Sequence, residues 1–308
     1  MESRIILKIA DGTEIVFEDI LSFTFEKNAY MPYTSFSAVA CSEIDSIESV
    51  SEVSFIFGGK RIHHGICDTL DIYTENGKGF CRIVSKGFTS LLCRNQLEEG
   101  LKTNISFNAL MESFYTLPFV EHEDNSDTSN YIYVKPNSVM WDGVVNLAYK
   151  LYGRYPYIRG TNNVRITPIE LPVGFVYRDN AILKKGIRIN TSRIISDYHM
   201  ADINGSYGEF ELINNEAHQL NIIRNNFSEL DKQFLYSPQE ALVFRDRFNT
   251  REKLSHYFVY SGYNGEDITD IVTFSDIMEK KITGVKVIGN SNGIFTEISV
   301  NNDYFNRE

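Results

Sequence analysis

The sequence predicts a mixed, β-rich α+β fold built from three successive units. Aromatic residues make up 13% of the 308 residues, and 18 Tyr and 21 Phe accompany a single Trp, a bias that favours strands. Short alternating apolar runs separated by Gly and Asn turns fill both ends of the chain, whereas the middle carries apolar residues at helical spacing. We therefore expect a β unit, a small α/β unit and a second β-rich unit.

The first 86 residues predict six or seven short strands. Asp11-Gly12 and Asn76-Gly77 are hairpin-turn signals, and Gly65 predicts a bulge within its strand. Close strand spacing of this kind is typical of a small barrel or a sandwich. The strand candidates are residues 4–9, Thr13–Glu18, Ser22–Lys27, Ser35–Ser42, Ser51–Phe57, Arg61–Tyr73 and Phe80–Ser85.

Helical spacing begins at residue 87 and marks the second unit. A first helix is expected in Lys86–Gln96 and a second in Phe107–Tyr115, the latter with Leu110, Met111 and Phe114 on one side. Residues 119–130 are acidic and polar without apolar periodicity, which predicts a solvated loop.

The helix with the clearest signals follows Pro136. Asn137 or Ser138 is its expected N-cap, and Asp142 lies in the first turn, where the helix dipole favours a carboxylate. Gly153 ends the helix. Its apolar face comprises Trp141, Val144, Val145, Ala148 and Leu151, and a hairpin turning at residues 160–163 is expected next.

The rest of the chain predicts strands with a helical insertion around 214–262. Asn204-Gly205 is a hairpin turn, and Ser237-Pro238-Gln239-Glu240 combines a capping box with Pro at the first helical position. Lys253–Ser261 is compatible with strand or helix. The remaining candidates are strands at Ile187–Thr191, Arg193–Ile203 and Gly208–Ile213, a helix at Glu216–Lys232, and a closing hairpin of Ile282–Ile288 and Ile294–Val300.

Charge excludes several classes of partner. The chain has 30 basic and 41 acidic residues, a net charge of −11 spread evenly along its length. Without a basic block, a phosphate-backbone clamp or a surface for anionic lipid is not expected. No apolar run approaches a membrane span, and the mixed-charge start MESRIILKIADGTE does not predict a secretory signal.

The cysteines and histidines give no metal or nucleophile pattern. Cys41, Cys67, Cys81 and Cys93 form no CxxC pair, so we expect buried thiols in a reducing compartment. No helical two-His motif, nucleophile elbow or phosphate loop occurs. The adjacent histidines 63 and 64 point to opposite faces if they lie on a strand, one outward and one partly buried.

Carboxylates and tyrosines leave two weak signals open. The acids are all in polar, loop-like contexts where they stay solvated, although Glu266, Asp267 and Asp270 are also compatible with a calcium site. Tyrosines near turns suit either an interface or an ordinary β core. The candidate acids are Glu98, Glu99, Glu121, Glu123, Asp124, Glu266, Asp267 and Asp270; the tyrosine groups are Tyr30–Tyr33, Tyr152–Tyr157 and Phe258–Tyr263.

Several segments together resemble a known family. They are Gly59-Lys60 through His64-Gly65, KGFTSLLCRNQLEEG, SVMWDGVVNLAYKLYG, YPYIRGTNNVRITP and the ending EKKITGVKVIGNSNGIFTEISVNNDYF. In this pattern the chain resembles baseplate hub proteins of contractile phage tails, in the form found in prophages and tail-like bacteriocins of Gram-positive bacteria. It is more distantly similar to late-control D proteins and to the hub half of type VI secretion spikes.

The resemblance implies a plan for the whole chain. It implies two related small β-barrel domains, at 1–86 and 171–308, flanking an α/β domain at 87–170. It also implies a homotrimer that adapts a sixfold tail tube to a threefold central spike, with a polar or acidic channel. Its partners would be the tube, spike and tape-measure proteins and other baseplate proteins, in a virion or tail-like particle assembled from protein made in the bacterial cytoplasm. No catalytic, cofactor or metal residue, membrane insertion or sequence-specific nucleic-acid binding is expected.

Two other classes of function remain as alternatives. A tail-associated peptidoglycan hydrolase would need a buried Glu or Asp of raised pKa in a cleft. A glycan- or receptor-binding tail protein would need exposed Tyr residues.

Overall fold

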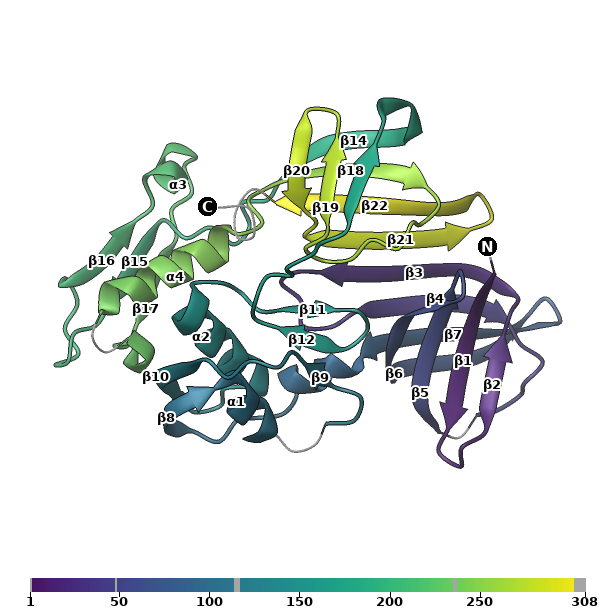
Figure 1. The fold of residues 1–308 in the computed structure, drawn as a ribbon, viewed down its shortest axis with the longest axis horizontal. Helices are drawn as coiled ribbons and strands as arrows, with labels where there is room; N and C mark the ends of the chain where they lie inside the picture. Colours follow the sequence, from purple (N-terminus) through teal and green to yellow (C-terminus); the bar gives the residue numbers. More distant parts are fainter. Residues whose placement is uncertain (1, 48, 114–116, 235–236, 302–308) are drawn as a thin grey trace.

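The computed structural model describes residues 2–47, 49–113, 117–234 and 237–301, and strands dominate it. One large sheet of eleven strands runs across the molecule in the order β14-β18-β22-β21-β3-β4-β7-β6-β5-β1-β2. The α/β segments lie beneath and to one side of this sheet (Figure 1). The β-rich α+β class predicted from the sequence is confirmed.

The first 87 residues supply seven strands of the large sheet, as the alternation predicted. In β5, Val53, Phe55 and Phe57 all face the core. The strands are β1 (Ser3–Ile9), β2 (Glu14–Phe17), β3 (Ile20–Asn28), β4 (Ser35–Cys41), β5 (Val50–Phe57), β6 (Lys60–Glu75) and β7 (Lys78–Gly87).

Gly65 has a different role from the predicted one. The irregularities of β6 lie opposite Phe55/Ile56 and between Cys67 and Thr69, so Gly65 is not a bulge. A Cβ atom at Gly65 would lie 2.0 Å from the carbonyl oxygen of Lys86. The glycine therefore permits close backbone approach between β6 and β7.

The C-terminal strands extend this sheet across a seam. β21 (Gly284–Asn290) pairs antiparallel with β3 from Gly284↔Asn28 to Gly289↔Phe23. Beyond β21 follow β22 (Gly293–Asn301), β18 (Leu254–Ser261) and β14 (Ile182–Ile189). The seam thus separates β3-β4-β7-β6 from β21-β22-β18-β14. The expected closed barrels are not seen, because the sheet stays open at β14 and β2 in the described part of the chain.

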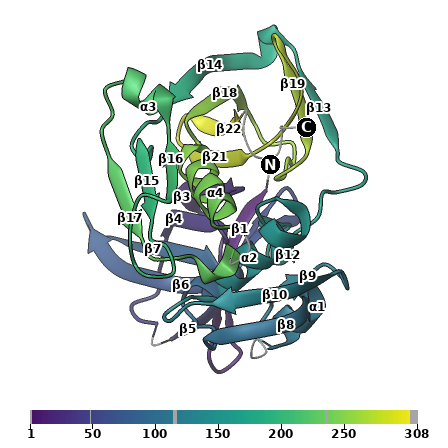
Figure 2. The same ribbon diagram turned by 90° about the vertical axis from the view of Figure 1, so that its left-hand side faces the viewer.

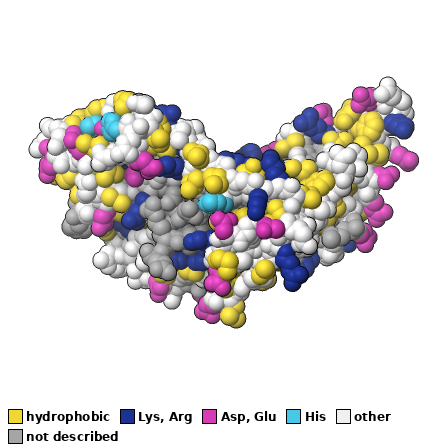
Figure 3. All heavy atoms as spheres, turned by 90° about the horizontal axis from the view of Figure 1, so that it is seen from above, with side chains coloured by type: hydrophobic (Ala, Val, Ile, Leu, Met, Phe, Trp, Pro, Cys, Tyr) yellow, Lys and Arg dark blue, Asp and Glu magenta, His cyan; other side chains and the backbone are white. Residues whose placement is uncertain are grey.

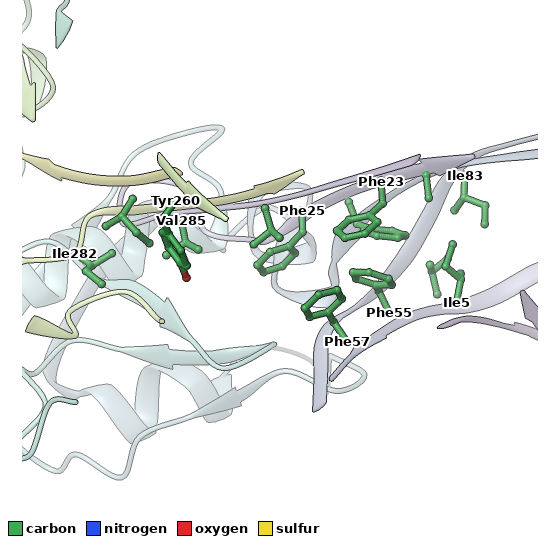
Figure 4. Packing of buried hydrophobic residues seen from close by; sticks show 14 of the residues in the cluster. Ile5, Phe23, Phe25, Phe55, Phe57, Ile83, Tyr260, Ile282 and Val285 are labelled. Carbon is green, nitrogen blue, oxygen red and sulfur yellow. The ribbon is translucent and has the colours of Figure 1, made fainter. Parts of the chain in front are cut away.

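A single hydrophobic core crosses the seam. The rings of Phe23 and Phe55 have centroids 4.8 Å apart, and Phe36 stacks on Phe55 at 4.6 Å. The same cluster continues through Phe25 and Val285 to Tyr260 of the C-terminal strands (Figure 4). Packing against this core, rather than isolated strand propensity, holds the two halves in one register.

The middle segment forms a second core. Its helices and strands are the 3-10 helix η1 (Phe88–Cys93), β8 (Gly100–Ser106), α1 (Phe107–Ser113), β9 (Glu121–His122), β10 (Thr128–Val134), α2 (Met140–Tyr152), β11 (Tyr157–Arg159) and β12 (Asn163–Arg165). The Lys86–Gln96 helix is only the short η1. The prediction of a solvated loop at residues 119–130 is wrong, because this segment contains β9 and the start of β10. Strand β10 pairs with β8. Phe114 and Tyr115 lie outside the described residues.

Helix α2 matches its predicted face but not its predicted cap. Trp141, Val144, Val145 and Ala148 are buried, and Gly153 adopts φ 63° at the C-cap. The N-cap is Val139 rather than Asn137 or Ser138. The side chain of Asp142 accepts a hydrogen bond from the Val139 N–H at 2.9 Å and satisfies that donor.

Beyond residue 170 the chain adds two three-stranded sheets. One has the order β13-β19-β20, from β13 (Gly174–Tyr177), β19 (Ile271–Phe274) and β20 (Ile277–Lys281). The other has the order β16-β15-β17, from β15 (Asp197–Met200), β16 (Phe210–Ile213) and β17 (Asn225–Ser228). The helices here are η2 (Asp179–Ala181), α3 (Asn215–Gln219), η3 (Lys232–Phe234) and α4 (Pro238–Thr250).

Two predictions in this region change. The expected helix Glu216–Lys232 is limited to α3, and its later part forms strand β17. The predicted strand Arg193–Ile203 is confined to β15.

Helix α4 starts at Pro238 as predicted and covers the inner face of the β16-β15-β17 sheet (Figure 2). Lys253–Ser261, left open from the sequence, is strand β18. None of the described helices is long and apolar enough to cross a membrane.

Candidate assembly surface

The strand β14 ends the large sheet and pairs with a neighbour on one side only among the described strands. Its partner is β18, from Ile182↔Tyr260 to Ile189↔Leu254. Leu183, Ile187 and Ile189 are 60%, 60% and 69% exposed. A long apolar edge strand offers unpaired backbone groups to another chain, so β14 is a candidate site for strand addition.

The charges of β14 are all of one sign. Lys184, Lys185 and Arg188 lie among its eight residues, which include no acid. Lys184 and Arg188 lie over the ring of Tyr257, at 5.6 and 5.0 Å from its centroid. Gly186 makes room for this ring, since a Cβ atom there would lie 2.9 Å from the Tyr257 hydroxyl oxygen. The ring thus holds both cations along the edge strand.

The strand β6 provides a second exposed edge beyond Gly65. β5 accompanies β6 only from Lys60 to Gly65, whereas β7 continues beside it to Glu75. The resulting arm projects from the sheet (Figure 1). Residues 66–75 include Asp68, Asp71 and Glu75 and no basic residue. The eight strands from β14 to β6, here called the front layer, therefore end in two edges of opposite charge, although the large sheet continues from β6 through β5 and β1 to β2.

Exposed apolar side chains gather in the last part of the chain. Of the large hydrophobic residues that are more than half exposed, Leu101 alone lies before residue 171 among the described residues. Figure 3 shows one face hollowed between two arms, with hydrophobic side chains on both. The later ones are Leu171, Val173, Val176, Leu183, Ile187, Ile189, Ile203, Ile213, Ile223, Phe227 and Met278. They are spread over β13, β14, β20 and the β16-β15-β17 sheet, so they mark more than one candidate contact surface.

A buried polar junction joins strand β3 of the large sheet to the middle segment and to the loop before β19. The Lys27 ammonium on β3 donates to the Gly160 carbonyl at 2.6 Å and to the Asp267 carboxylate. Arg159 donates to Asp270 at 2.8 Å. Burial lowers the pKa of Lys27, and the charge of Asp267 opposes that effect. The cluster ties the large sheet, the β11–β12 turn and the 264–270 loop together.

The prediction that the acids at 266–270 are solvated is wrong. Glu266 and Asp270 are 2% and 1% exposed. Glu266 accepts hydrogen bonds from the hydroxyls of Tyr177 and Tyr260, and burial raises the pKa of both phenols. Donors already engage these carboxylates, and no group of three or more His, Cys, Asp or Glu suited to a metal occurs among the described residues. The geometry gives the calcium hypothesis no support.

The other candidate acids do not converge on a cleft. Glu98, Glu99, Glu121 and Asp124 are exposed. Glu123, predicted to lie in a solvated loop, is buried instead and accepts hydrogen bonds from the backbone N–H groups of residues 166 and 167 at 2.7 and 2.8 Å. It fastens β9 to the strand end after β12.

The two adjacent histidines lie on opposite faces of β6, but neither points to solvent. His63 is 0% exposed between the hydroxyls of Thr34 and Ser85, at 2.8 and 2.7 Å. Burial and the neighbouring His64 lower the pKa of His63 to about 3. His64 is 5% exposed and lies 2.8 Å from the Glu52 carboxylate. The prediction of one outward histidine is therefore wrong.

The cysteines and tyrosines take structural positions. All four cysteines are free thiols; Cys81 is buried and the other three are half-buried. Burial raises the pKa of Cys81 and Cys93 to about 11, which keeps them as thiols at neutral pH. From the three tyrosine groups, Tyr30, Tyr155, Tyr157 and Tyr260 are buried, as in an ordinary β core.

One pocket of about 280 Å³ opens beside the polar junction. Lys27, Tyr263 and Asp267 line it, together with the backbone of the Gly58 turn. Lys60, Arg61 and Glu266 also line it, so the pocket holds two cations outside the junction and a buried carboxylate that accepts hydrogen bonds from two tyrosine hydroxyls.

The edge strands were not predicted from the sequence as a candidate site. The sequence ILKKGIRI of β14 does indicate a basic, apolar strand, because it combines three cations with branched apolar residues and contains no acid. Its position at the end of a sheet depends on the long-range pairing with β18, which residue order does not reveal.

Comparison with solved structures identifies related folds. A tail protein from Neisseria meningitidis MC58 aligns with a TM-score of 0.72 at 12% identity, over 99% of this chain and 98% of that one. The 43 kDa tail protein of prophage MuSo2 from Shewanella oneidensis aligns with a TM-score of 0.69 at 12% identity, over 96% and 97%.

A more distant likeness links the chain to secretion systems. An E. coli type VI secretion component, described as similar to the T4 tail proteins gp27 and gp5, aligns with a TM-score of 0.57 at 8% identity, over 91% of this chain and 73% of that one. At these identities the likeness is one of fold. No protein-family model matches the chain, and no curated protein matches its sequence.

Proposed function

We propose that the chain is a structural baseplate hub subunit of a contractile tail or tail-like particle. In this proposal three copies form a ring that adapts the sixfold tail tube to the threefold central spike. The observation that carries the proposal is the front layer of the large sheet, in which four strands lie on each side of the β3–β21 seam. Three chains would present six such halves to a sixfold tube.

The free edges suggest how the ring closes. All neighbouring strands from β6 through the seam to β14 are antiparallel. If copies are related by rotation about the ring axis, β14 of one copy meets β6 of the next in antiparallel orientation as well. The row of backbone hydrogen bonds would then continue from chain to chain.

Charge complementarity favours this pairing over pairing of like edges. β14 carries Lys184, Lys185 and Arg188, and the β6 arm carries Asp68, Asp71 and Glu75. Within the chain Lys185, Arg188 and Asp68 also form ion pairs, so Lys184, Asp71 and Glu75 contribute most to the complementarity. Two β14 edges would place three cations against three cations, which costs free energy at an interface. A head-to-tail contact therefore suits a closed ring rather than a twofold dimer.

The folds of the structural neighbours support the same assignment. One is described as a tail protein, one as a prophage tail protein and one as a type VI secretion component. The proposed partners are the tube, spike and tape-measure proteins and other baseplate proteins, and the proposed location is the baseplate of the particle. We retain 1–86, 87–170 and 171–308 as proposed units, the first and third being the two halves of the ring sheet.

A mechanical role also fits the state of the polar groups. The buried carboxylates Glu123, Glu266 and Asp270 hold strands and loops in place through hydrogen bonds and ion pairs. The tyrosine groups expected for glycan binding are largely within the core. These contacts favour a structural protein over the hydrolase and glycan-binding alternatives.

Co-expression tests the proposal. The chain is produced together with the tube and spike proteins of the same particle, and the complexes are isolated through a tag on the spike. The proposal expects three copies of this chain for each spike trimer in native mass spectrometry. A spike that binds the tube without this chain contradicts the proposal, as does clearing of purified cell walls by the chain alone.

A further inference from the structure

The β16-β15-β17 sheet has one covered face and one open face. Tyr198 and Met200 of β15 point inward and pack with Ala241 and Leu242 of α4. The register places His199 beside Glu211 and Phe227 on the opposite face. This outer face, on the arm at the left of Figures 1 and 3, is not part of the proposed ring contact.

Aromatic rings form an exposed cluster on this face. His199 stacks on Phe227 with ring centroids 4.5 Å apart, and Tyr207 meets Phe227 edge-on at 5.2 Å. Phe227 is 61% exposed and Tyr207 is 50% exposed. Glu211 lies 2.9 Å from His199, with its side chain 42% exposed. His199 covers one face of Phe227 and engages Oε1 of Glu211, so a cation placed there would contact the exposed ring surface and the other carboxylate oxygen.

Branched aliphatic side chains extend the apolar area around the cluster. Ile213 lies on the same face through its pairing with Asp197, and it is 56% exposed. Ile203 and Ile223 border the sheet and are 87% and 64% exposed. Burial of such side chains against a partner removes apolar area from water, which favours binding at this surface.

The surrounding charge is strongly acidic. Residues 202–229 contain five acids and a single basic residue, Arg224. That guanidinium donates to the backbone carbonyls of residues 191, 192 and 194 at 2.9, 2.9 and 3.0 Å. The acids are Asp202, Glu209, Glu211, Glu216 and Glu229, of which Glu216 forms an ion pair with Lys253 and Glu211 lies beside His199. A negative field of this kind repels nucleic acid and anionic lipid.

We propose that this acidic sheet face, formed by His199, Tyr207, Glu211, Ile213 and Phe227, docks a basic amphipathic segment of a partner protein. A Lys or Arg of the segment lies over Phe227 and Tyr207 and pairs with Glu211, while its apolar residues cover Ile213. The aliphatic residues favour a polypeptide over a sugar, because they offer a glycan no hydrogen bonds. The charge complementarity favours a basic partner over a second copy of this acidic chain.

Peptide binding tests the inference. The probes are a fluorescent 14-residue peptide with alternating Lys/Arg and Leu/Ile, and the same peptide with Glu in place of each cation. Fluorescence anisotropy with the full-length chain should give a dissociation constant of about 100 μM or tighter for the basic probe, and at least tenfold weaker binding for the acidic one. The affinity for the basic probe should fall as salt is raised.

Variants locate the binding on this face. Phe227→Ser combined with Tyr207→Ser should weaken binding of the basic probe at least tenfold, and Glu211→Lys alone should weaken it several-fold. Met278→Ser, another exposed apolar position, and Glu99→Lys, another exposed acid, are the matched controls and should bind as the parent does. Thermal unfolding by circular dichroism checks that each variant is folded.

Four results would overturn the inference. They are equal binding of the acidic and basic probes, unchanged binding by both face variants, equal losses in the two controls, and oligosaccharide-array binding that depends on Phe227. Self-association that Phe227→Ser removes in analytical ultracentrifugation would instead assign the face to a second copy. Since none of the variants touches β14 or β6, their outcome is independent of the proposed ring.

Discussion

At the residue scale, His63 shows how burial turns an ionisable group into a structural one. Its ring lies between two hydroxyls within the core, and its pKa is lowered to about 3. The unfolded chain binds a proton at this residue below about pH 6.5, whereas the folded chain does not. Falling pH therefore favours the unfolded state, and stability is lost from about pH 6.5 downward.

This linkage predicts a specific pH dependence. At pH 5 the His63 contribution should lower the free energy of unfolding by about 2 kcal/mol relative to pH 7. Urea unfolding at both pH values measures the loss, and His63→Gln should remove that component of it. His256→Gln, at a half-buried histidine, is the control that should retain it. An unchanged pH dependence in His63→Gln would contradict the buried, neutral state of His63.

Trp141 is the residue for which sequence and structure agree most closely. It is 5% exposed and packs in the middle core with Leu97, Leu110 and Tyr155. We predict that Trp141→Ala costs about 3–5 kcal/mol in urea unfolding, because the cavity adds to the lost burial. Leu101→Ala, at a position 59% exposed in the same segment, should cost far less. A cost below about 1 kcal/mol for Trp141→Ala would mean that the helix face is wrong.

Three acids also show why burial of the candidate carboxylates could not be predicted from the sequence. Glu123, Glu266 and Asp270 stand in polar stretches, and a polar stretch is ordinarily solvated. Their burial depends on partners 43 to 111 residues away in the chain, such as the N–H of Ile166, the Tyr177 hydroxyl and Arg159. The residues next to each acid in the sequence do not reveal such distant partners.

At the scale of elements, alternation and turn residues predicted the strands of the first unit well. The strands β1, β4 and β5 and the closing β21–β22 hairpin follow period-two patterns with one buried face. Their sequences therefore indicate both that a strand forms and which residues it contains. Shorter strands such as β13, β17 and β20 have four or five residues and little alternation. Their formation depends on tertiary pairing, which outweighs local propensity.

Strand β6 offers a test of close backbone approach. A Cβ at Gly65 would lie 2.0 Å from the Lys86 carbonyl oxygen, so Gly65→Ala should push β6 and β7 apart at a cost of about 1–3 kcal/mol. Gly174 in β13 is the matched control, since a Cβ there meets no atom within 4 Å. Chemical denaturation of both variants measures the difference. Equal stability of the two would contradict the predicted steric conflict at Gly65.

At the scale of the whole molecule, the two ends of the front layer have complementary charge. The proposed ring therefore predicts that Lys184→Glu with Arg188→Glu, or Asp71→Lys with Glu75→Lys, each prevents trimer formation by like-charge repulsion. Mixing the two variants cannot close a homotrimer, but combining all four changes in one chain should restore it. Sedimentation velocity at moderate salt measures the oligomer. Trimers of unchanged stability in either double variant would exclude this contact.

The arrangement of the units was the least predictable level. The order of β, α/β and β segments followed from the change between strand-like and helix-like hydrophobic spacing along the chain. The predicted barrels followed from the resemblance to baseplate hub proteins. The shared core across β3 and β21, and the open sheet that it stabilises, depend on pairing between residues more than 250 positions apart, such as Gly284 and Asn28. Periodicity within a segment cannot specify such a contact.

The most direct test of the central claim is negative-stain electron microscopy of the purified chain, alone and with the spike protein of the same particle, at moderate salt. We expect class averages of a threefold ring with a central hole, formed by the chain alone or on the spike. Single compact particles under both conditions would contradict the hub assignment.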